Sequence, residues 1–143
     1  MLGANRTRIF ILLHGASADL FLDTRICNGH TTASDSLWAG VPLITLKGAH
    51  FASRVASSLL TAIGLPELVT VSLDEYEALA LRLARNPAEL AATRARLAQN
   101  RLTAPLFDTP RFARNLEGAY KEMWRLYLAG EAPRMIVVVD AAP

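Results

Sequence analysis

Short runs of consecutive apolar residues dominate the first half of the sequence. They are rich in leucine, isoleucine, valine and phenylalanine, and turn residues separate them. Runs of this length and composition are typical of β-strands that are buried on both faces of a sheet. The expected strands cover residues 9–13, 20–22, 43–46 and 68–71.

Between and after these runs, apolar residues recur at helical spacing, and turn residues mark the helix ends. Gly40 and Pro42 end the first expected helix, and Gly64 ends the second. A Ser72-x-x-Glu75 capping box begins the third. The expected helices cover residues 31–39, residues 51–63, the stretch from the capping box to Asn86, residues 87–102, and a long final helix with an apolar stripe from Phe112 to Tyr127.

Strands that alternate with helices predict an α/β fold, in which a parallel sheet is covered on both faces and a helical C-terminal tail follows. The 143 residues, of which 52% are hydrophobic, suit one folded domain. A complete doubly wound domain has about six strands, and fewer are expected here. The sequence therefore predicts a partial Rossmann-like parallel sheet that begins midway through such a domain.

The composition excludes several classes of function. The formal net charge is only +2, so we expect no nucleic acid as a partner. No signal peptide is recognised at Met1, and the apolar run at 135–139 is far shorter than the roughly 20 residues that span a bilayer, so we expect no membrane association. Cys27 is the only cysteine, which fits a reducing, cytoplasmic location.

The residues with the most informative chemistry follow the strand at 20–22. In parallel sheets, ligands bind beyond the carboxyl ends of the strands, where loops lead into helices. A helix start offers unpaired amides and a positive dipole end to a phosphate, and Gly29 lets the backbone approach closely. Thr31 and Thr32 add hydroxyls, and Asp35 lies one turn further on the same face, where a carboxylate suits the hydroxyls of a ribose.

The same residues also have an interpretation without a ligand. Thr32-x-x-Asp35 has the spacing of a helix-capping pair, and a single histidine such as His30 is more often structural than functional. Composition and spacing alone leave both interpretations open.

A longer pattern gives the segment a more specific interpretation. The chain resembles the O-GlcNAc transferase/SPINDLY family of glycosyltransferases over residues 18–133. The motifs that carry the resemblance lie at 22–24, 27–32 with Asp35, 37–42, 52–56, 65–68, 105–107 and 123–124. Two short stretches depart from the family pattern, Arg25-Ile26 and the four residues from Lys47 to His50.

The resemblance implies the C-terminal half of a GT-B fold. It assigns residues 1–133 to an N-terminally truncated nucleotide-sugar-binding domain and residues 134–143 to a tail. In the family, the positions matching His30, Thr31 and Thr32 contact the diphosphate region, and the position matching Asp35 holds the ribose. Gly29 belongs to the predicted site because it lets the backbone approach the phosphate closely. No catalytic residue is assigned within this chain.

The resemblance also implies a donor and an acceptor. The family transfers GlcNAc from UDP-GlcNAc to Ser or Thr of proteins without a metal ion or other cofactor, and GDP-fucose is the alternative donor. The protein acceptor is selected by an N-terminal repeat region that this chain does not contain. We therefore expect the chain to be inactive alone, and a non-catalytic remnant or interaction module is the alternative interpretation.

The final helix has a further implication. In GT-B proteins the C-terminal helix commonly crosses back onto the N-terminal half, and the resemblance implies that this half is missing here. We therefore expect the stripe from Phe112 to Tyr127 to form an exposed apolar patch, or to be covered by a partner chain or in a homodimer.

Overall fold

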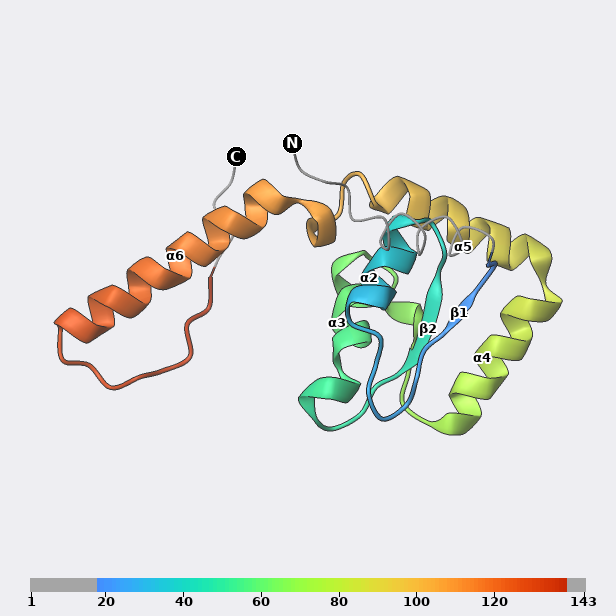
Figure 1. Ribbon diagram of the computed structural model, residues 1–143, viewed down its shortest axis with the longest axis horizontal. Coiled ribbons are helices and arrows are strands. Elements are labelled where there is room, and N and C mark those ends of the chain that lie inside the picture. The colour runs from blue at the N-terminus through green and yellow to red at the C-terminus, as the bar shows by residue number, and fades with distance from the viewer. Residues whose placement is uncertain (1–17, 139–143) are drawn as a thin grey trace. The chain divides into compact units, whose positions relative to one another are not determined.

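The computed structural model describes residues 18–138, so the strand expected at 9–13 lies outside the described residues. The chain divides into two compact units, Met1–Leu106 and Phe107–Pro143. The first unit contains the sheet and the helices around it, and the second contains one long helix and the segment that follows it (Figure 1).

The sheet of the first unit is parallel, as predicted. Over residues 18–138 it consists of β1 (Phe21–Leu22), β2 (Leu43–Leu46) and β3 (Val69–Thr70), in that order. Leu22 pairs with Ile44 across the first ladder, and Thr45 pairs with Val69 across the second. The central strand is closed off from water, since Ile44 and Thr45 are both 0% exposed.

Helices cover both faces of the sheet. The helices of the first unit are α2 (Thr31–Trp38), α3 (Val55–Ala62), α4 (Leu73–Arg85) and α5 (Pro87–Asn100). Because each crossover joins neighbouring parallel strands in the usual right-handed sense, α2 and α3 lie on the same face. The chain crosses to the other face after β3, where α4 packs against β2 and β3 (Figure 1). This arrangement confirms the α/β class.

Local signals fix the helix ends. Gly40 and Gly64 end α2 and α3 with φ of 85° and 76°, a region that favours glycine. The Ser72 hydroxyl caps α4 by accepting from the Glu75 amide (3.2 Å). The Glu75 carboxylate accepts in return from the Val71 amide (2.9 Å), one residue earlier than in a regular capping box.

The second expected helix is interrupted. A 3-10 turn, Phe51–Ser53, comes first, and Arg54 separates it from α3. The buried Ser53 hydroxyl donates to the His50 carbonyl (3.0 Å), and the Gly48 amide donates to the Ser53 carbonyl (2.8 Å). These bonds close a tight turn, which replaces the first part of the expected helix.

The core of the first unit is built from aliphatic side chains on both faces of β2. Burying one such side chain stabilises the fold by about 1.5–3 kcal/mol. Those with less than 2% exposure include Leu37, Leu43, Ile44, Leu60, Ile63, Leu65, Leu83 and Leu97.

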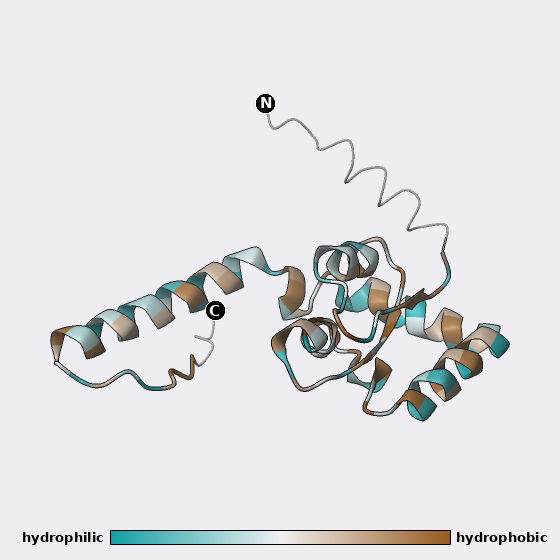
Figure 2. Ribbon diagram, turned by 60° about the horizontal axis from the view of Figure 1, so that its bottom comes forward, coloured by the Kyte–Doolittle hydropathy of each residue, from teal (hydrophilic) through white to brown (hydrophobic). Residues whose placement is uncertain are grey.

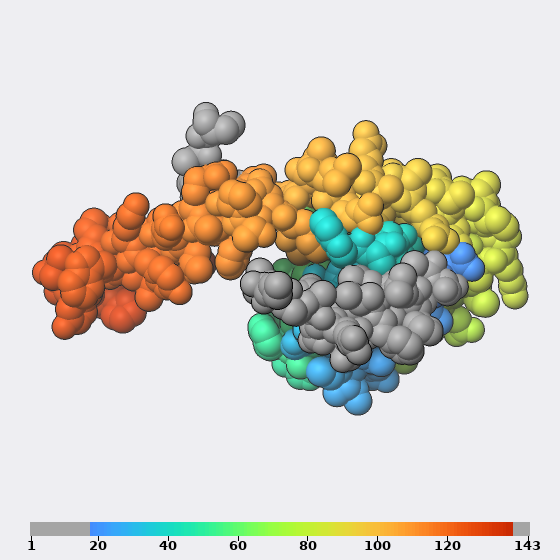
Figure 3. Space-filling model, turned by 45° about the horizontal axis from the view of Figure 1, so that its top comes forward, coloured from blue at the N-terminus to red at the C-terminus, as the bar shows by residue number. Residues whose placement is uncertain are grey.

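The C-terminal end of α5 also contacts α2. The Arg101 guanidinium donates to the Trp38 carbonyl and lies 5.5 Å from the centroid of a Trp38 ring. In Figure 3 the cyan surface of the residues near 40 adjoins the yellow surface of α5. This contact ties the end of α2 to the residue that follows α5.

The second unit is built around α6 (Thr109–Leu128). The Asp108 carboxylate accepts from the Arg111 amide at its start (3.0 Å), and Gly130 follows its end with φ of 67°. Apolar and polar bands alternate along the helix (Figure 2). The predicted stripe is exposed: Phe112 is 65% exposed and Tyr127 is 73% exposed.

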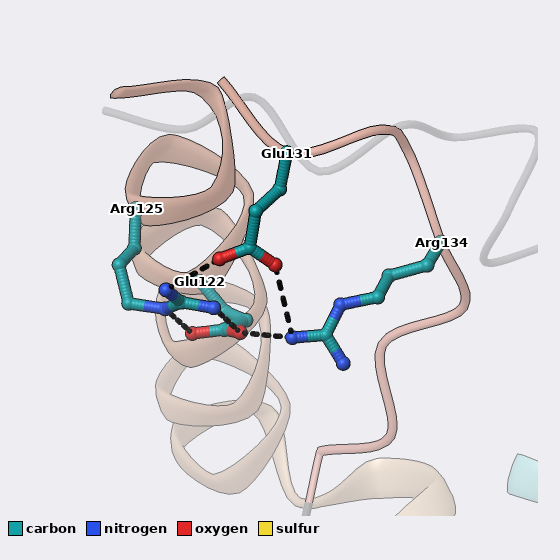
Figure 4. Close-up of polar contacts among 4 residues, drawn as sticks. All are labelled: Glu122, Arg125, Glu131 and Arg134. Carbon is teal, nitrogen blue, oxygen red and sulfur yellow. Dashed lines mark hydrogen bonds and ion pairs between the residues drawn. The ribbon is translucent and has the colours of Figure 1, made fainter. Parts of the chain in front are cut away.

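A cluster of charged side chains holds the segment after α6 against the helix (Figure 4). Arg125 pairs with Glu122 (2.9 Å) and with Glu131 (3.0 Å), and Arg134 lies 3.5 Å from Glu122. The hydrogen bond from Arg125 lowers the pKa of Glu122, and the charges of Arg125 and Arg134 act in the same direction. A single exposed ion pair is weak. The segment after α6 is therefore held by the network in which these pairs share Arg125 and Glu122.

Between residues 18 and 138, no helix has both the length and the apolar character needed to cross a membrane.

Candidate functional site

The loops that follow the three strands meet at one edge of the sheet, as the parallel topology requires. The Asn28 amide, in the loop after β1, donates to the Ala52 carbonyl in the loop after β2 (2.8 Å). The His30 and Phe51 rings meet edge to face, with centroids 5.8 Å apart. The two loops therefore form one continuous rim around the start of α2.

Among residues 18–138, the backbone amides at the start of α2 lack hydrogen-bond acceptors. His30 is the N-cap residue, and its side chain makes no capping bond. The first backbone bond of the helix runs from the Ser34 amide to the His30 carbonyl (3.1 Å). The amides of Thr31, Thr32 and Ala33 come before this bond and have no acceptor among the described residues. A helix start in this state is suited to an anion.

Thr31 and Thr32 are exposed at this helix start. Their hydroxyls donate no hydrogen bond to any residue between 18 and 138. Thr32 is the second helical residue, not the N-cap, so the capping-pair interpretation of Thr32 and Asp35 is wrong for this structure. The two hydroxyls extend the set of donors that the amides provide.

Gly29 allows a close approach within the chain. A Cβ at this position would lie 2.9 Å from the Thr32 hydroxyl oxygen and 3.3 Å from the Ala33 amide nitrogen. A side chain here would therefore crowd the Thr32 hydroxyl and the Ala33 backbone at the helix start. The Gly29 amide itself donates to the Asp23 carboxylate (2.7 Å).

Asp35 lies apart from the other predicted site residues. The structure brings Gly29, His30, Thr31 and Thr32 together at the rim, whereas Asp35 is one turn further along α2 and only 3% exposed. It also has an interaction within the chain. A ribose would reach this carboxylate only after the groups that cover it had moved.

Basic side chains lie at the same edge of the sheet. Lys47 directly follows β2, and Arg54 precedes α3; both are exposed, and neither has an ion-pair partner in the described part of the chain. They line one end of an open groove of about 1100 Å³ along α3 and β3. Uncompensated positive charge near the start of α2 favours an anionic ligand.

The sequence analysis missed a buried polar network beneath the rim. The Asp23 carboxylate, 6% exposed, accepts from the Thr45 hydroxyl (2.6 Å) as well as from Gly29. Tyr76 donates to the Asp23 carbonyl (3.0 Å); burial raises the pKa of Tyr76, and the charge of Asp23 adds to this effect. Two features of the sequence could have indicated this network: Asp23 directly follows one apolar strand, and Thr45 lies within the next.

Among the described residues, no group of three or more His, Cys, Asp or Glu side chains is placed to hold a metal ion.

The structure therefore defines an α/β protein with an open parallel sheet, and within residues 18–138 a helix start at its carboxyl edge is suited to a phosphorylated ligand. The comparison with protein families is more specific. The model of glycosyl transferase family 41 matches residues 11–116, and the chain belongs to this family.

Individual relatives agree with the family match. The chain is 49% identical over 124 residues to the probable UDP-N-acetylglucosamine–peptide N-acetylglucosaminyltransferase SEC of Arabidopsis thaliana, which covers 86% of this chain. It is 42% identical over 116 residues to the UDP-N-acetylglucosamine–peptide N-acetylglucosaminyltransferase of Caenorhabditis elegans, which covers 81% of it.

A solved structure is also similar. A mutant O-GlcNAc transferase of Thermobaculum terrenum superimposes with a TM-score of 0.76 at 40% identity, over 81% of this chain. The chain spans 22% of that structure and 13% and 10% of the plant and nematode relatives. The comparisons therefore show the fold and the family of this chain, and they match only a small part of each relative's length.

Proposed function

We propose that this chain binds the nucleotide diphosphate of a sugar donor at the start of α2, as part of a protein O-glycosyltransferase that uses UDP-GlcNAc. Family membership and the names of the relatives, which specify UDP-N-acetylglucosamine and a peptide acceptor, support this donor and this acceptor.

One observation carries the proposal. The amides of Thr31, Thr32 and Ala33 have no acceptor among residues 18–138, and the Thr31 and Thr32 hydroxyls lie beside them. A diphosphate supplies several oxygens that accept from such donors, and the helix dipole favours its charge. When the sugar is transferred, the same donors stabilise the charge that develops on the leaving diphosphate, so the proposed site includes no metal ion.

The remaining site residues complete the proposal. The exposed His30 ring, which rests edge-on against Phe51, borders the diphosphate region. The Gly29 backbone holds the loop close to Thr32. Asp35 accepts from the ribose hydroxyls after its surroundings have rearranged, which makes donor binding and a local movement at α2 a single event.

Isothermal titration of the chain with UDP and GDP tests the proposal. We expect UDP to bind, and Thr32→Val to weaken its binding by about 1–3 kcal/mol because a hydrogen bond to a charged group is lost. Asp35→Ala is expected to weaken binding by a similar amount. The matched control is Thr93→Val on α5, where the hydroxyl donates to the Glu89 carbonyl (2.9 Å), and it should bind UDP as wild type does.

Two results would count against this assignment. Tighter binding of GDP than of UDP would favour GDP-fucose as the donor. Unchanged UDP affinity in Thr32→Val, together with a lower free energy of unfolding, would give Thr32 a purely structural role.

We also propose that another polypeptide covers the apolar stripe of α6. The partner that we propose is a second copy of this chain, so the chain should form a dimer through this stripe. Tyr120, Met123 and Trp124 are 58%, 54% and 60% exposed, far more than expected of large apolar side chains on one helix face. Sedimentation should show concentration-dependent association that Tyr120→Lys abolishes and that Lys121→Glu, at a neighbouring polar position, leaves intact. A wild-type chain that stays monomeric at all concentrations would exclude the second copy.

A further inference from the structure

Asp23 stands at the point where the sheet passes into the candidate site. It follows β1 directly, and its amide donates to the Ile44 carbonyl (3.1 Å), which continues the ladder with β2 by one residue. The Tyr76 hydroxyl, from α4, donates to its carbonyl (3.0 Å). The backbone of Asp23 is therefore fixed to elements on two sides.

The carboxylate of Asp23 extends this fixed point to the loop. One oxygen accepts from the Thr45 hydroxyl (2.6 Å), on the central strand, and the other accepts from the Gly29 amide (2.7 Å). Both are short bonds to an almost fully buried carboxylate, and hydrogen bonds to carboxylates are the stronger kind. Gly29 immediately precedes His30, so the bond fixes the residue from which α2 begins.

The loop between these two residues has few other constraints. Within it, the Asn28 side chain donates to the Thr24 carbonyl (2.9 Å) and the Thr24 hydroxyl donates to the Cys27 carbonyl, both local bonds. Beyond it, the Asn28 amide bonds to Ala52. Without the Asp23 carboxylate, the loop would lose its link to the central strand. A ligand would then have to order the loop when it binds, which would weaken its affinity.

Resting on the proposed function, we propose that Asp23 is a positioning residue: it holds the Gly29 amide so that the amides and hydroxyls of Thr31 and Thr32 are oriented for the diphosphate. Both of its oxygens are engaged inside the chain, so Asp23 does not bind the ligand. A negative charge behind an anion site is electrostatically unfavourable for the ligand, and only the geometric effect on the loop offsets it.

Variants of both ends of the bridge test this role. Asp23→Ala removes both acceptors, and we expect UDP to bind about tenfold or more weakly. Asp23→Asn keeps an acceptor oxygen for Gly29, and its amide donates to the Thr45 oxygen, so we expect UDP to bind within about threefold of wild type. Thr45→Val leaves Asp23 in place but frees one of its oxygens, and we expect an intermediate loss.

Thr93→Val is the matched control. Thr93 is also a buried threonine, and its hydroxyl donates to the Glu89 carbonyl (2.9 Å) in α5, away from the loop. Thr45→Val and Thr93→Val should lower the free energy of unfolding comparably, whereas only Thr45→Val should weaken UDP binding. Hydrogen exchange of the Gly29 amide supplies a second measurement, and it should accelerate in Asp23→Ala and Thr45→Val alone.

The outcomes separate this inference from the proposed function. If wild type binds UDP and a folded Asp23→Ala binds it equally well, the positioning role is excluded and donor binding stands. If Asp23→Ala does not fold, Thr45→Val takes its place in the test. A Thr45→Val chain that binds UDP as tightly as wild type would then exclude the positioning role of Asp23. If wild type binds neither UDP nor GDP, the proposed function fails, and the positioning role fails with it.

Discussion

Replacing Leu37 by alanine is expected to lower the free energy of unfolding by about 3 kcal/mol. Leu37 is 0% exposed, and it lies on α2, which packs against both β2 and α3. The substitution removes buried methyl groups and leaves a cavity that the surrounding strand and helix cannot close. Urea denaturation followed by circular dichroism measures the loss. Because α2 carries the candidate site, UDP affinity should fall as well.

Leu81→Ala is the matched control for this prediction. Leu81 also lies within a helix, α4, but it is 42% exposed, so the same change in side chain should cost less than about 1 kcal/mol. Equal losses in the two variants would show that α2 is not packed as described.

Replacing Gly48 by alanine should lower the free energy of unfolding by about 2–3 kcal/mol. The added Cβ would lie 2.1 Å from the Ser53 hydroxyl oxygen and 2.6 Å from the Ser53 Cβ. Ser53 is 1% exposed and hydrogen-bonded to His50, so it has no space into which it can move. The turn between β2 and α3 must therefore open, which a thermal or urea melt would detect.

The neighbouring Ala49→Ser provides the comparison. Ala49 is exposed in the same turn, and one additional atom there should leave stability unchanged within about 0.5 kcal/mol. A Gly48→Ala variant as stable as Ala49→Ser would mean that the turn has a different conformation in solution.

Much of the fold was predictable because its signals are local. Continuous apolar runs identified β1, β2 and β3, and Gly40 and Gly64 marked helix ends that the structure confirms with positive φ. The start of α2 followed from the same kind of signal, a turn residue before a helical pattern. Parallel topology then placed the loop after β1 at the sheet edge where ligands bind.

The remainder depends on contacts between residues that are far apart in the sequence. Thr45 is 22 residues from Asp23 and Tyr76 is 53 residues from it, so no local pattern indicates that they meet. Asp35 shows a related limit. Helical spacing places it one turn from Thr31, but α2 is packed on more than one side, and periodicity alone does not indicate which polar residue is buried there.

The division into two units has a practical consequence for spectroscopy. The sequence has two tryptophans, Trp38 on α2 and Trp124 on α6, so each unit contains its own fluorophore. The tryptophan emission of a Trp124→Phe chain would come only from the sheet-containing unit, and that of a Trp38→Phe chain only from the long helix. Their melting curves would reveal whether the polypeptide loses its order in one cooperative step or in two.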